Sequence, residues 1–219
     1  AFTRSGIPSA RRFIGARMIE SGSLKVKEIK MKPLISAATP MLLASTSRYR
    51  RELLARLGVP FEAAAPGTDE TPLAGEAPAA LARRLARSKA QDVAARHPER
   101  WVLGSDQVPA FDGRILGKPG ARAEGLAQLL ACSGKSVTFY TAAALVGGGA
   151  VYECLDTTTV RFRTLTPDEA GRYLDAEPAY DCAGTFKVEG LGISLFESVE
   201  STDPTALVDD LAGGLEAAV

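Results

Sequence analysis

From Met41 onward, short apolar stretches alternate with longer amphipathic ones, and this alternation limits the folds open to the chain. "MLLAS" from Met41, "FEAAA" from Phe61 and "WVLGSD" from Trp101 are predicted strands, because short apolar runs bounded by turn residues are typical of buried strands. Ser47–Leu57 and Ala79–Arg96, which lie between them, have apolar residues at helical spacing. Strands separated by helices predict a mixed α/β sheet with helices on its flanks.

The second half of the chain predicts antiparallel pairing. "VPAFDGRILGKP" is typical of a hairpin turning at Asp112–Gly113, and "SVTFYTAAALV" pairs with "VYECLDTTTVRFR" around a glycine turn. A helix is expected at Arg122–Cys132, and Thr166 followed by Glu169 has the capping-box spacing that starts another helix. "GISLFESV" is the last expected strand, and the tail from Asp203 is expected to be helical.

Composition narrows the class of protein. The 219 residues carry a formal net charge of +0 and are 46% hydrophobic, which suits one α/β domain with a substantial core. Zero net charge argues against a general nucleic-acid or membrane-surface binder, and no apolar run reaches the roughly 18 residues of a membrane span. We expect neither nucleic acid nor membrane as a partner, although a local basic patch could bind a small anion.

The cysteines and the histidine disfavour several chemistries. Cys132, Cys154 and Cys182 are odd in number and widely spaced, which fits neither a disulfide framework nor a zinc pattern and indicates a reducing, cytoplasmic compartment. The single histidine, His97, precedes Pro98 at an expected helix end, where a solvated cap is its ordinary role. A Ser-His-Asp triad and histidine-based metal sites are therefore disfavoured.

Residues 1–40 show no alternation of strands and helices. Their opening, "AFTRSGIPSARRFIGAR", is basic and poor in acidic residues, which loosely resembles a transit sequence. We expect either a disordered leader or a start site placed too far upstream, with Met31 and Met41 as the alternative starts.

Polar side chains gather where the early strands are expected to end and helices to begin, which is where open α/β sheets bind ligands. In "LLASTSRYRRELL", Ser45 and Ser47 can donate hydroxyl hydrogen bonds, and Arg50 can bind phosphate oxygens with its guanidinium fork. The N-terminus of a helix adds free N–H groups that suit an anion. The alternative is an ordinary capped and solvated basic helix.

Carboxylates and lysines follow in three further segments. In "GTDET", Asp69 and Glu70 could hold a hard divalent cation, although an ordinary acidic loop has the same composition. Asp106 follows an apolar stretch, so we expect a partly desolvated carboxylate at the sheet edge that acts as a base or a metal ligand. Lys118 lies on a stiff turn from which it could reach phosphate, whereas Lys89 alone is an ordinary surface lysine.

No segment is specific alone, and a strand-end aspartate with a turn lysine could equally be a buried salt bridge. Together the segments supply hydroxyls, arginine, lysines and carboxylates without histidine, a set that suits hydrolysis of a phosphoanhydride by metal-activated water. The chain lacks a Walker A pattern, so P-loop phosphoryl transfer is not predicted.

Several motifs resemble, in the same order, those of the Maf family of nucleoside triphosphate pyrophosphatases. They are "LLASTSRYRRELL", "DET", "ARSKAQ", "GSDQV", "GRILGKP" and "YDCAGTFKVEGLGISLFE", within residues 41–208. "GSDQV" and "CAGTFKVEGLGI" are similar to the branch that hydrolyses 7-methyl-GTP, whereas the other main branch acts on dTTP and UTP. The resemblance implies an elongated mixed sheet with flanking helices and two lobes around a cleft, as in the inosine-triphosphate pyrophosphatases.

The resemblance also implies an activity and its residues. The bond between the α and β phosphates is cleaved to give a nucleoside monophosphate and diphosphate, with a divalent cation, Mg²⁺ or Mn²⁺. Asp106 is the implied proton acceptor and, with Glu70, the implied metal ligand. The implied phosphate ligands are Ser45, Ser47, Arg50, Lys89 and Lys118.

Three positions set the base preference in such families, and here they are Tyr49, Gln107 and Glu189. A 7-methylated guanine is positively charged, so stacking on Tyr49 adds a cation–π contribution on the order of 0.5–2 kcal/mol. Glu189 can accept from the guanine N1–H and exocyclic amine, a donor pair that thymine and uracil lack, and Gln107 can both donate and accept. The alternatives are a Tyr49 packed on the core and a solvated Glu189.

The chain departs from the family at its end. The family continues after "DPTALV" with Gly-Leu-Pro, whereas here "DDLAGGLEAAV" follows, so residues 209–219 are expected to be a divergent tail, and Ser201 stands where the family often has glycine. We therefore keep open a pyrophosphatase for dTTP, UTP or other modified nucleotides, and a weakly active nucleotide-binding regulator of cell division. A homodimer is the expected assembly, if the protein is not a monomer.

Overall fold

The computed structural model describes residues 35–188 and 190–201. Within these residues it contains seven strands, four α-helices and one 3₁₀ helix. The strands are β1 (Met41–Ala44), β2 (Phe61–Ala64), β3 (Val102–Phe111), β4 (Arg114–Ile115), β5 (Ser136–Gly147), β6 (Ala150–Phe162) and β7 (Phe196–Glu200). The helices are α1 (Arg48–Arg56), α2 (Pro78–Arg96), α3 (Arg122–Cys132), α4 (Pro167–Ala176) and the 3₁₀ helix η1 (Leu191–Leu195). None of the helices in this described part combines the length and the apolar character needed to cross a membrane.

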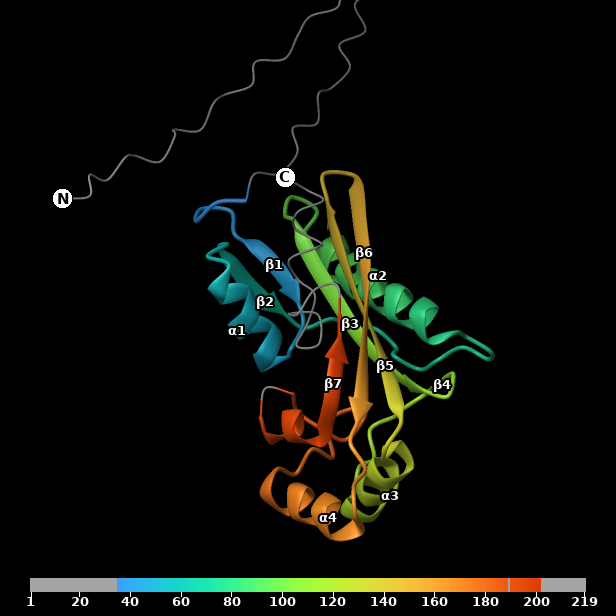
Figure 1. Cartoon of the computed structure of the whole chain (residues 1–219). Coiled ribbons are helices and arrows are strands. Elements are labelled where there is room, and N and C mark those ends of the chain that lie inside the picture. The colour runs from blue at the N-terminus through green and yellow to red at the C-terminus, as the bar shows by residue number, and fades with distance from the viewer. Residues whose placement is uncertain (1–34, 189, 202–219) are drawn as a thin grey trace, which may run out of the picture. The chain divides into compact units, whose positions relative to one another are not determined.

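The strands form one mixed sheet, as predicted. Its order is β2-β1-β3-β5-β6-β7, with β4 paired to β3 beside this path (Figure 1). β1 is parallel to both β2 and β3, whereas β3, β5, β6 and β7 are antiparallel to their neighbours. The chain passes from β1 to β2 on one side and then to β3 on the other. The C-terminal end of β1 is thus a point where strand order reverses, and such points form ligand crevices.

β3 is longer than predicted and runs through Asp106 instead of ending there. Its pairing with β5 is continuous from Val102 to Ala110, with Asp106 opposite Ala142. The strand continues because Val108 and Ala110 extend the buried pattern beyond the polar residues. The expectation that Asp106 lies at the end of its strand is therefore wrong.

The expected hairpin and last strand are confirmed in part. Asp112 and Gly113 adopt positive φ values of 51° and 71°, as the turn between β3 and β4 requires. "GISLFESV" is a strand only from Phe196, because Leu191–Leu195 forms η1 instead. The helix expected from Asp203 lies outside the described residues.

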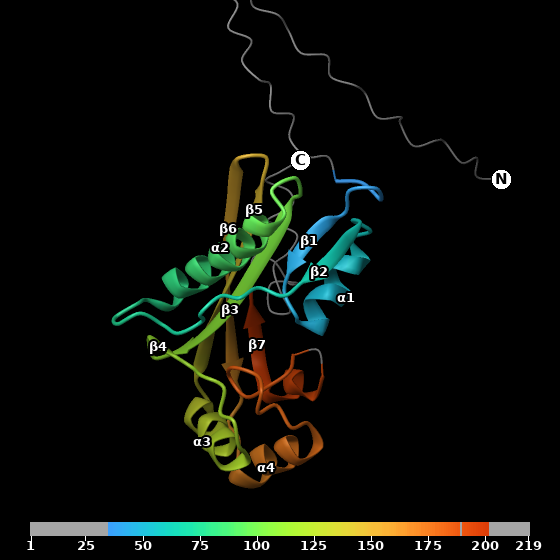
Figure 2. The ribbon, with the colours of Figure 1, turned by 180° about the vertical axis from the view of Figure 1, so that it is seen from behind.

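Alternate residues of β1 face opposite sides of the sheet, and each side is covered by a helix. Leu42 and Ala44 belong to the core cluster with α2, whereas Met41 and Leu43 belong to the cluster with Leu54 of α1. Figures 1 and 2 show α1 and α2 on opposite faces of the sheet. This half of the protein thus has three layers, with β1 and β3 in the middle one.

A third core cluster lies at the other end of the long β5–β6 hairpin, where α3 and α4 pack (Figure 1). Phe186 is its aromatic centre, with edge-on contacts to Phe139, Phe162 and Phe196 at ring-centroid distances of 5.3, 5.8 and 4.8 Å. This cluster forms a second lobe, so the two-lobed mixed α/β fold is confirmed.

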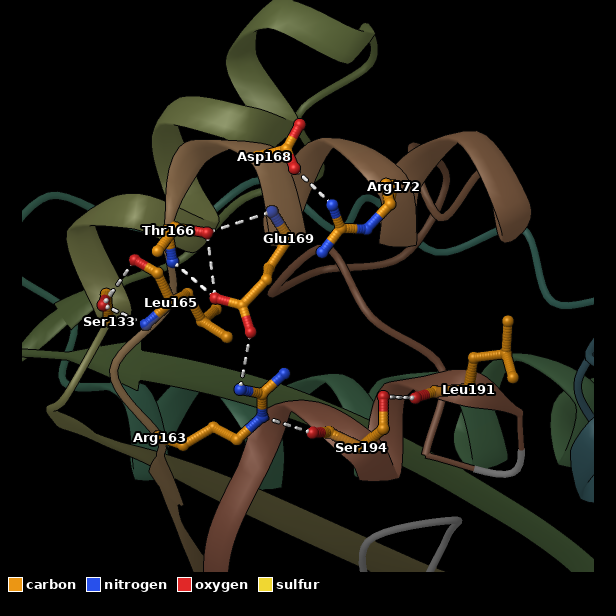
Figure 3. Close-up of polar contacts among 9 residues, drawn as sticks. All are labelled: Ser133, Arg163, Leu165, Thr166, Asp168, Glu169, Arg172, Leu191 and Ser194. Atoms are coloured by element: carbon orange, nitrogen blue, oxygen red, sulfur yellow. Dashed lines mark hydrogen bonds and ion pairs between the residues drawn. The ribbon is translucent and has the colours of Figure 1, made fainter.

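Hydrogen bonds fix the start of α4 within the second lobe (Figure 3). Thr166 caps the helix and Glu169 reaches back to the Thr166 N–H at 2.9 Å, which confirms the capping box. Arg163 donates to Glu169 at 3.1 Å and to the Ser194 carbonyl at 2.7 Å, which links α4 to η1. Hydrogen bonds from the Thr166 N–H and from Arg163 lower the pKa of Glu169 to about 2, so this link stays charged at neutral pH.

A glycine of β3 sets how closely α2 approaches the sheet. A Cβ atom at Gly104 would lie 2.3 Å from the Ala86 carbonyl oxygen and 2.7 Å from the Ala90 nitrogen, both backbone atoms of α2. Any larger residue would push the helix away, because a backbone cannot rotate aside as a side chain can. Lys89 lies between these two helical positions, so Gly104 brings Lys89 close to β3.

We expect Gly104→Ala to lower the free energy of unfolding by about 3 kcal/mol, the upper part of the range for overpacking. The reason is the clash with the α2 backbone, and thermal or urea unfolding measures the effect. Gly67→Ala is the matched control, because a Cβ there would meet only Asp92 at 3.9 Å. Equal stability of the two variants would contradict the proposed role of Gly104.

Candidate active site

One cavity of about 700 Å³ gathers the predicted site residues. It lies at the C-terminal end of β1, beside the part of β3 that β1 does not reach, since β1 pairs with β3 only as far as Leu103. Nine of the ten predicted residues that the structure describes line it: Ser45, Ser47, Tyr49, Arg50, Glu70, Lys89, Asp106, Gln107 and Lys118. Asp69 is not among its lining residues. Glu189 lies outside the described residues.

The position of the cavity explains how two adjacent residues of a strand can both line it. Asp106 and Gln107 are consecutive, so their side chains point to opposite faces of the sheet. Because the cavity opens where β1 has ended, it is reached from both faces. Gln107 donates from Nε2 to Thr141 Oγ1 of β5 at 3.0 Å, which orients its amide.

The turn between β1 and α1 holds its polar groups in a connected arrangement. Ser47 caps α1 by accepting from the Arg50 N–H at 3.3 Å, and the Ser47 N–H donates to Ser45 Oγ at 3.1 Å. The Arg50 guanidinium donates to the same Ser45 hydroxyl at 3.4 Å. Two hydroxyls and one guanidinium are thus fixed at one helix N-terminus, an arrangement that suits an anion.

Lys89 is buried beside two carboxylates. Its Nζ lies 2.5 Å from Asp106 Oδ1 and 2.7 Å from Glu70 Oε1, and only 5% of the residue is exposed. The prediction that Lys89 is by itself a surface lysine is wrong, because the close approach of α2 at Gly104 buries it. Asp69, in contrast, accepts from the Thr71 N–H at 2.9 Å and stabilises its own loop.

The pKa values of the Asp106 and Glu70 carboxyls are shifted in opposite directions. Burial raises the pKa of the Asp106 carboxyl above its ordinary value, and the Lys89 ammonium opposes this effect. Partial burial acts on Glu70 in the same sense, but the hydrogen bond and charge of Lys89, with Lys118 and Arg50, lower its pKa overall. Asp106 is therefore the more basic carboxylate, and Glu70 is the one that keeps its charge.

Two carboxylates of the cavity could bind a divalent cation whose remaining ligands are phosphate oxygens and water. Glu70 and Asp106 offer carboxylate oxygens to one cavity, and Mg²⁺ commonly takes one or two carboxylates together with phosphate oxygens and water. Across residues 35–188 and 190–201, no three or more histidine, cysteine, aspartate or glutamate side chains form a group that could hold a metal ion.

The second lobe contributes residues that the sequence analysis did not assign to the site. The same cavity is also lined by Phe139, Asp181, Cys182, Phe186 and Lys187. The Lys187 ammonium lies 3.7 Å from Asp181 Oδ1. The signal that could have found Lys187 was its place inside "CAGTFKVEG", where it is the one basic residue among mostly small or apolar ones.

Tyr49 lies in the first turn of α1, half-buried, and lines the cavity. Its ring is 5.8 Å from the Arg48 guanidinium carbon, which shows that a cation can already approach it. The alternative of a Tyr49 packed into the core is not what the structure has.

The chain is similar to a protein-family model and to several relatives that share one name. A family model described as Maf-like protein matches residues 40–208. The 7-methyl-GTP pyrophosphatase of Xanthomonas oryzae pv. oryzae is 59% identical over 168 residues, which cover 77% of this chain and 88% of the relative. Proteins of the same name from Cupriavidus metallidurans and Polaromonas sp. are 53% and 51% identical, over 77% and 80% of this chain and 85% and 81% of the relatives.

We expect Lys89→Met to lower the free energy of unfolding by about 3 kcal/mol at neutral pH, because it leaves the buried Asp106 carboxylate without its nearest cation. A carboxyl whose folded-state pKa is raised stabilises the fold below its unfolded pKa and loses that contribution as the pH rises through the folded value. The deficit should therefore shrink as the pH falls toward 4. Unfolding curves from pH 4 to 8 in metal-free buffer measure it.

Lys118→Met is the control for this change, because Lys118 also lines the cavity but is exposed. Its unfolding free energy should stay close to that of the parent protein at every pH. A pH-independent loss in Lys89→Met would mean that Lys89 stabilises the fold by packing alone.

Proposed function

The chain belongs to the Maf family, and on that premise we propose that it hydrolyses 7-methyl-GTP to 7-methyl-GMP and diphosphate. The observation that carries the proposal is the single cavity in which a phosphate-binding turn, a buried lysine between two carboxylates and an aromatic side chain meet. Relatives named 7-methyl-GTP pyrophosphatase, 51–59% identical to this chain, support the choice of substrate. We assign the activity to the domain at residues 41–208.

The proposed reaction needs a base that activates water and cations that neutralise the triphosphate. The oxygen of a water molecule forms a bond to the α-phosphorus, the bond from that phosphorus to the bridging oxygen breaks, and diphosphate leaves. Asp106 accepts the proton of the attacking water, a role that its higher basicity relative to Glu70 favours. Its burial limits competing contacts with bulk solvent.

Cationic and hydroxyl side chains of the cavity would bind the negatively charged triphosphate. We propose that Ser45, Ser47 and Arg50 bind phosphate at the start of α1, while Lys89 and Lys118 bind it from α2 and the segment after β4. Cations fixed in a partly buried site stabilise developing negative charge more than they would in water. Lys89 would then exchange part of its contact with Asp106 for contact with phosphate.

A divalent cation, Mg²⁺ or Mn²⁺, completes the proposal, with Glu70 and Asp106 as its protein ligands. When bound, it neutralises phosphate oxygens and lowers the pKa of coordinated water. Glu70 suits this role because its carboxyl has a lowered pKa and remains ionised.

Selection of the base is assigned to the end of the cavity at Tyr49. A positively charged 7-methylguanine stacked on Tyr49 gains a cation–π contribution of about 0.5–2 kcal/mol. Gln107, oriented by Thr141, and Glu189 would read the hydrogen-bonding edge of the base. We propose that the enzyme acts in the cytoplasm, because three widely spaced cysteines do not fit a disulfide framework. We propose a homodimer as its assembly.

We expect a substrate panel of 7-methyl-GTP, GTP, dTTP and UTP with Mg²⁺ or Mn²⁺ to show the highest kcat/KM for 7-methyl-GTP. Asp106→Asn should lose about 10²- to 10⁴-fold in kcat, the range for a missing general base, while still folding, with a circular dichroism spectrum like that of the parent protein. Preference for dTTP or UTP would overturn the substrate. Turnover of no triphosphate would favour a nucleotide-binding regulator of cell division.

We expect Tyr49→Ala to lower kcat/KM for 7-methyl-GTP several-fold more than for GTP, because only the methylated base carries the charge that the ring attracts. Tyr49→Phe is the control, since it keeps the ring and removes only the hydroxyl. An equal loss on both nucleotides in Tyr49→Ala would rule out stacking as the source of selectivity.

A further inference from the structure

A short segment between the aromatic cluster and η1 supplies one wall of the cavity. Lys187 and Val188 both line the cavity, and the Lys187 carbonyl accepts from the N–H groups of Gly190 and Gly192 at 3.1 and 3.0 Å. A Cβ at Gly192 would lie 2.4 Å from the Lys187 carbonyl oxygen. The backbone here is thus closed tightly on Lys187, and the position of that residue is fixed.

Two side chains from the end of α4 form hydrogen bonds to the backbone of this segment. The Tyr173 hydroxyl accepts from the Lys187 N–H at 3.1 Å and donates to Glu177 Oε2 at 3.1 Å. The same Glu177 oxygen accepts from the Leu191 N–H at 3.0 Å. A continuous path of three hydrogen bonds therefore joins the backbone at Lys187 to the backbone at Leu191.

Tyr173 and Glu177 pack closely against this segment, and the tyrosine is buried. Tyr173 is 6% exposed, and burial raises the pKa of its hydroxyl, which stays protonated and able to donate. A Cβ at Gly190 would lie 1.9 Å from Glu177 Oε1, so the carboxylate occupies the space above that glycine. Among the described residues that line the large cavity, neither Tyr173 nor Glu177 is found, so their effect on a ligand must pass through the segment that they hold.

The Lys187 side chain carries this effect to the base end of the cavity. Although burial acts against the charged form, the neighbouring Cys182, Asp181 and Tyr49 groups raise the pKa of Lys187, which keeps it an ammonium. Tyr49, the residue assigned to the base, is among the groups that interact electrostatically with Lys187. Lys89, in contrast, is paired with a carboxylate. An ammonium at this place can donate to a carbonyl oxygen on the edge of a nucleobase.

We infer that Lys187 is a further base-selecting residue of this enzyme, and that Tyr173 and Glu177 are its positioning residues. The inference rests on the proposed function, because it concerns the choice among nucleotides in the same cavity. The ligand chemistry is the C6 oxo group of a guanine. Thymine and uracil also carry oxo groups, but on a smaller ring system, which places them differently when the base stacks on Tyr49. The two positioning residues act without touching the nucleotide, through the three hydrogen bonds that set the place of the Lys187 backbone.

Amide hydrogen exchange tests the positioning without any substrate. Tyr173→Phe should speed exchange at the Lys187 amide, and Glu177→Ala should speed it at the Leu191 amide, because each loses its acceptor. Tyr180→Phe and Asp175→Ala are matched controls, because Tyr180 donates to the Leu174 carbonyl and Asp175 pairs with Arg122. Unchanged exchange at both amides would overturn the positioning role, whatever the protein's substrate.

Kinetics test the consequence for selection. Lys187→Met and Tyr173→Phe should each lower kcat/KM for 7-methyl-GTP by about tenfold, more than for the poorest substrate of the panel, because the loss of hydrogen bonds is felt at the base. The double variant should be no worse than Lys187→Met alone, since Tyr173 acts through Lys187. Equal losses on all nucleotides, or additive losses in the double variant, would overturn the inference.

Failure of the proposed function gives a different pattern. If the parent protein prefers another nucleotide, the same cycle is run on its best and poorest substrates, and a change in their ratio still supports selection by Lys187. If it turns over none, the dissociation constants of 7-methyl-GTP and UTP for the parent protein and Lys187→Met replace the rates. An unchanged ratio of the two constants would then overturn base selection.

Discussion

The buried ion pair between Lys89 and Asp106 is the interaction on which the rest of the site depends. A lysine and an aspartate from a helix and a strand can meet at 2.5 Å only because Gly104 lets α2 rest against the β3 backbone. The pair is costly to bury, and Glu70 at 2.7 Å from the same ammonium spreads the charge to the cavity surface. Stability and the proposed chemistry are therefore coupled, since the contact that completes the interior joins the proposed phosphate-binding lysine to the proposed base.

Much of the fold could be predicted, because the strands and helices follow local patterns. The parallel strands read as short apolar runs, and the β5–β6 pair reads as two long stretches around a glycine turn. The end of β3 could not be predicted, because Pro109 is typical of a break and only pairing with β5 shows that the strand continues. η1 was missed for a similar reason: "GISLF" has strand composition, but Gly192 packs against the Lys187 backbone and forces a turn.

The candidate site was predictable where one segment carries its own chemistry and less so where the fold brings distant groups together. Ser47 and Arg50 share one turn, so the cap that Ser47 forms and the proposed binding of an anion both follow from spacing. Lys89 has no local feature that indicates burial, because the cause is Gly104, 15 positions along the chain. For Lys187 the only signal was its place in "CAGTFKVEG". Its backbone is held by Tyr173 from a helix that precedes it, and hydrogen bonds of this kind leave no periodic trace in a sequence.

The long β5–β6 hairpin has a mechanical consequence for the two lobes. Its strands pair without interruption from Ser136 opposite Arg161 to Gly147 opposite Ala150, and β5 also pairs with β3 along nine positions. The lobes are therefore joined by an unbroken ladder of hydrogen bonds, where a hinged enzyme would have a flexible linker. Relative motion of the lobes must therefore bend or twist this ladder as a whole. Because a change in the width of the cavity would deform paired strands, we expect lobe motions to be small and ligand selection to depend on the side chains that line the cavity.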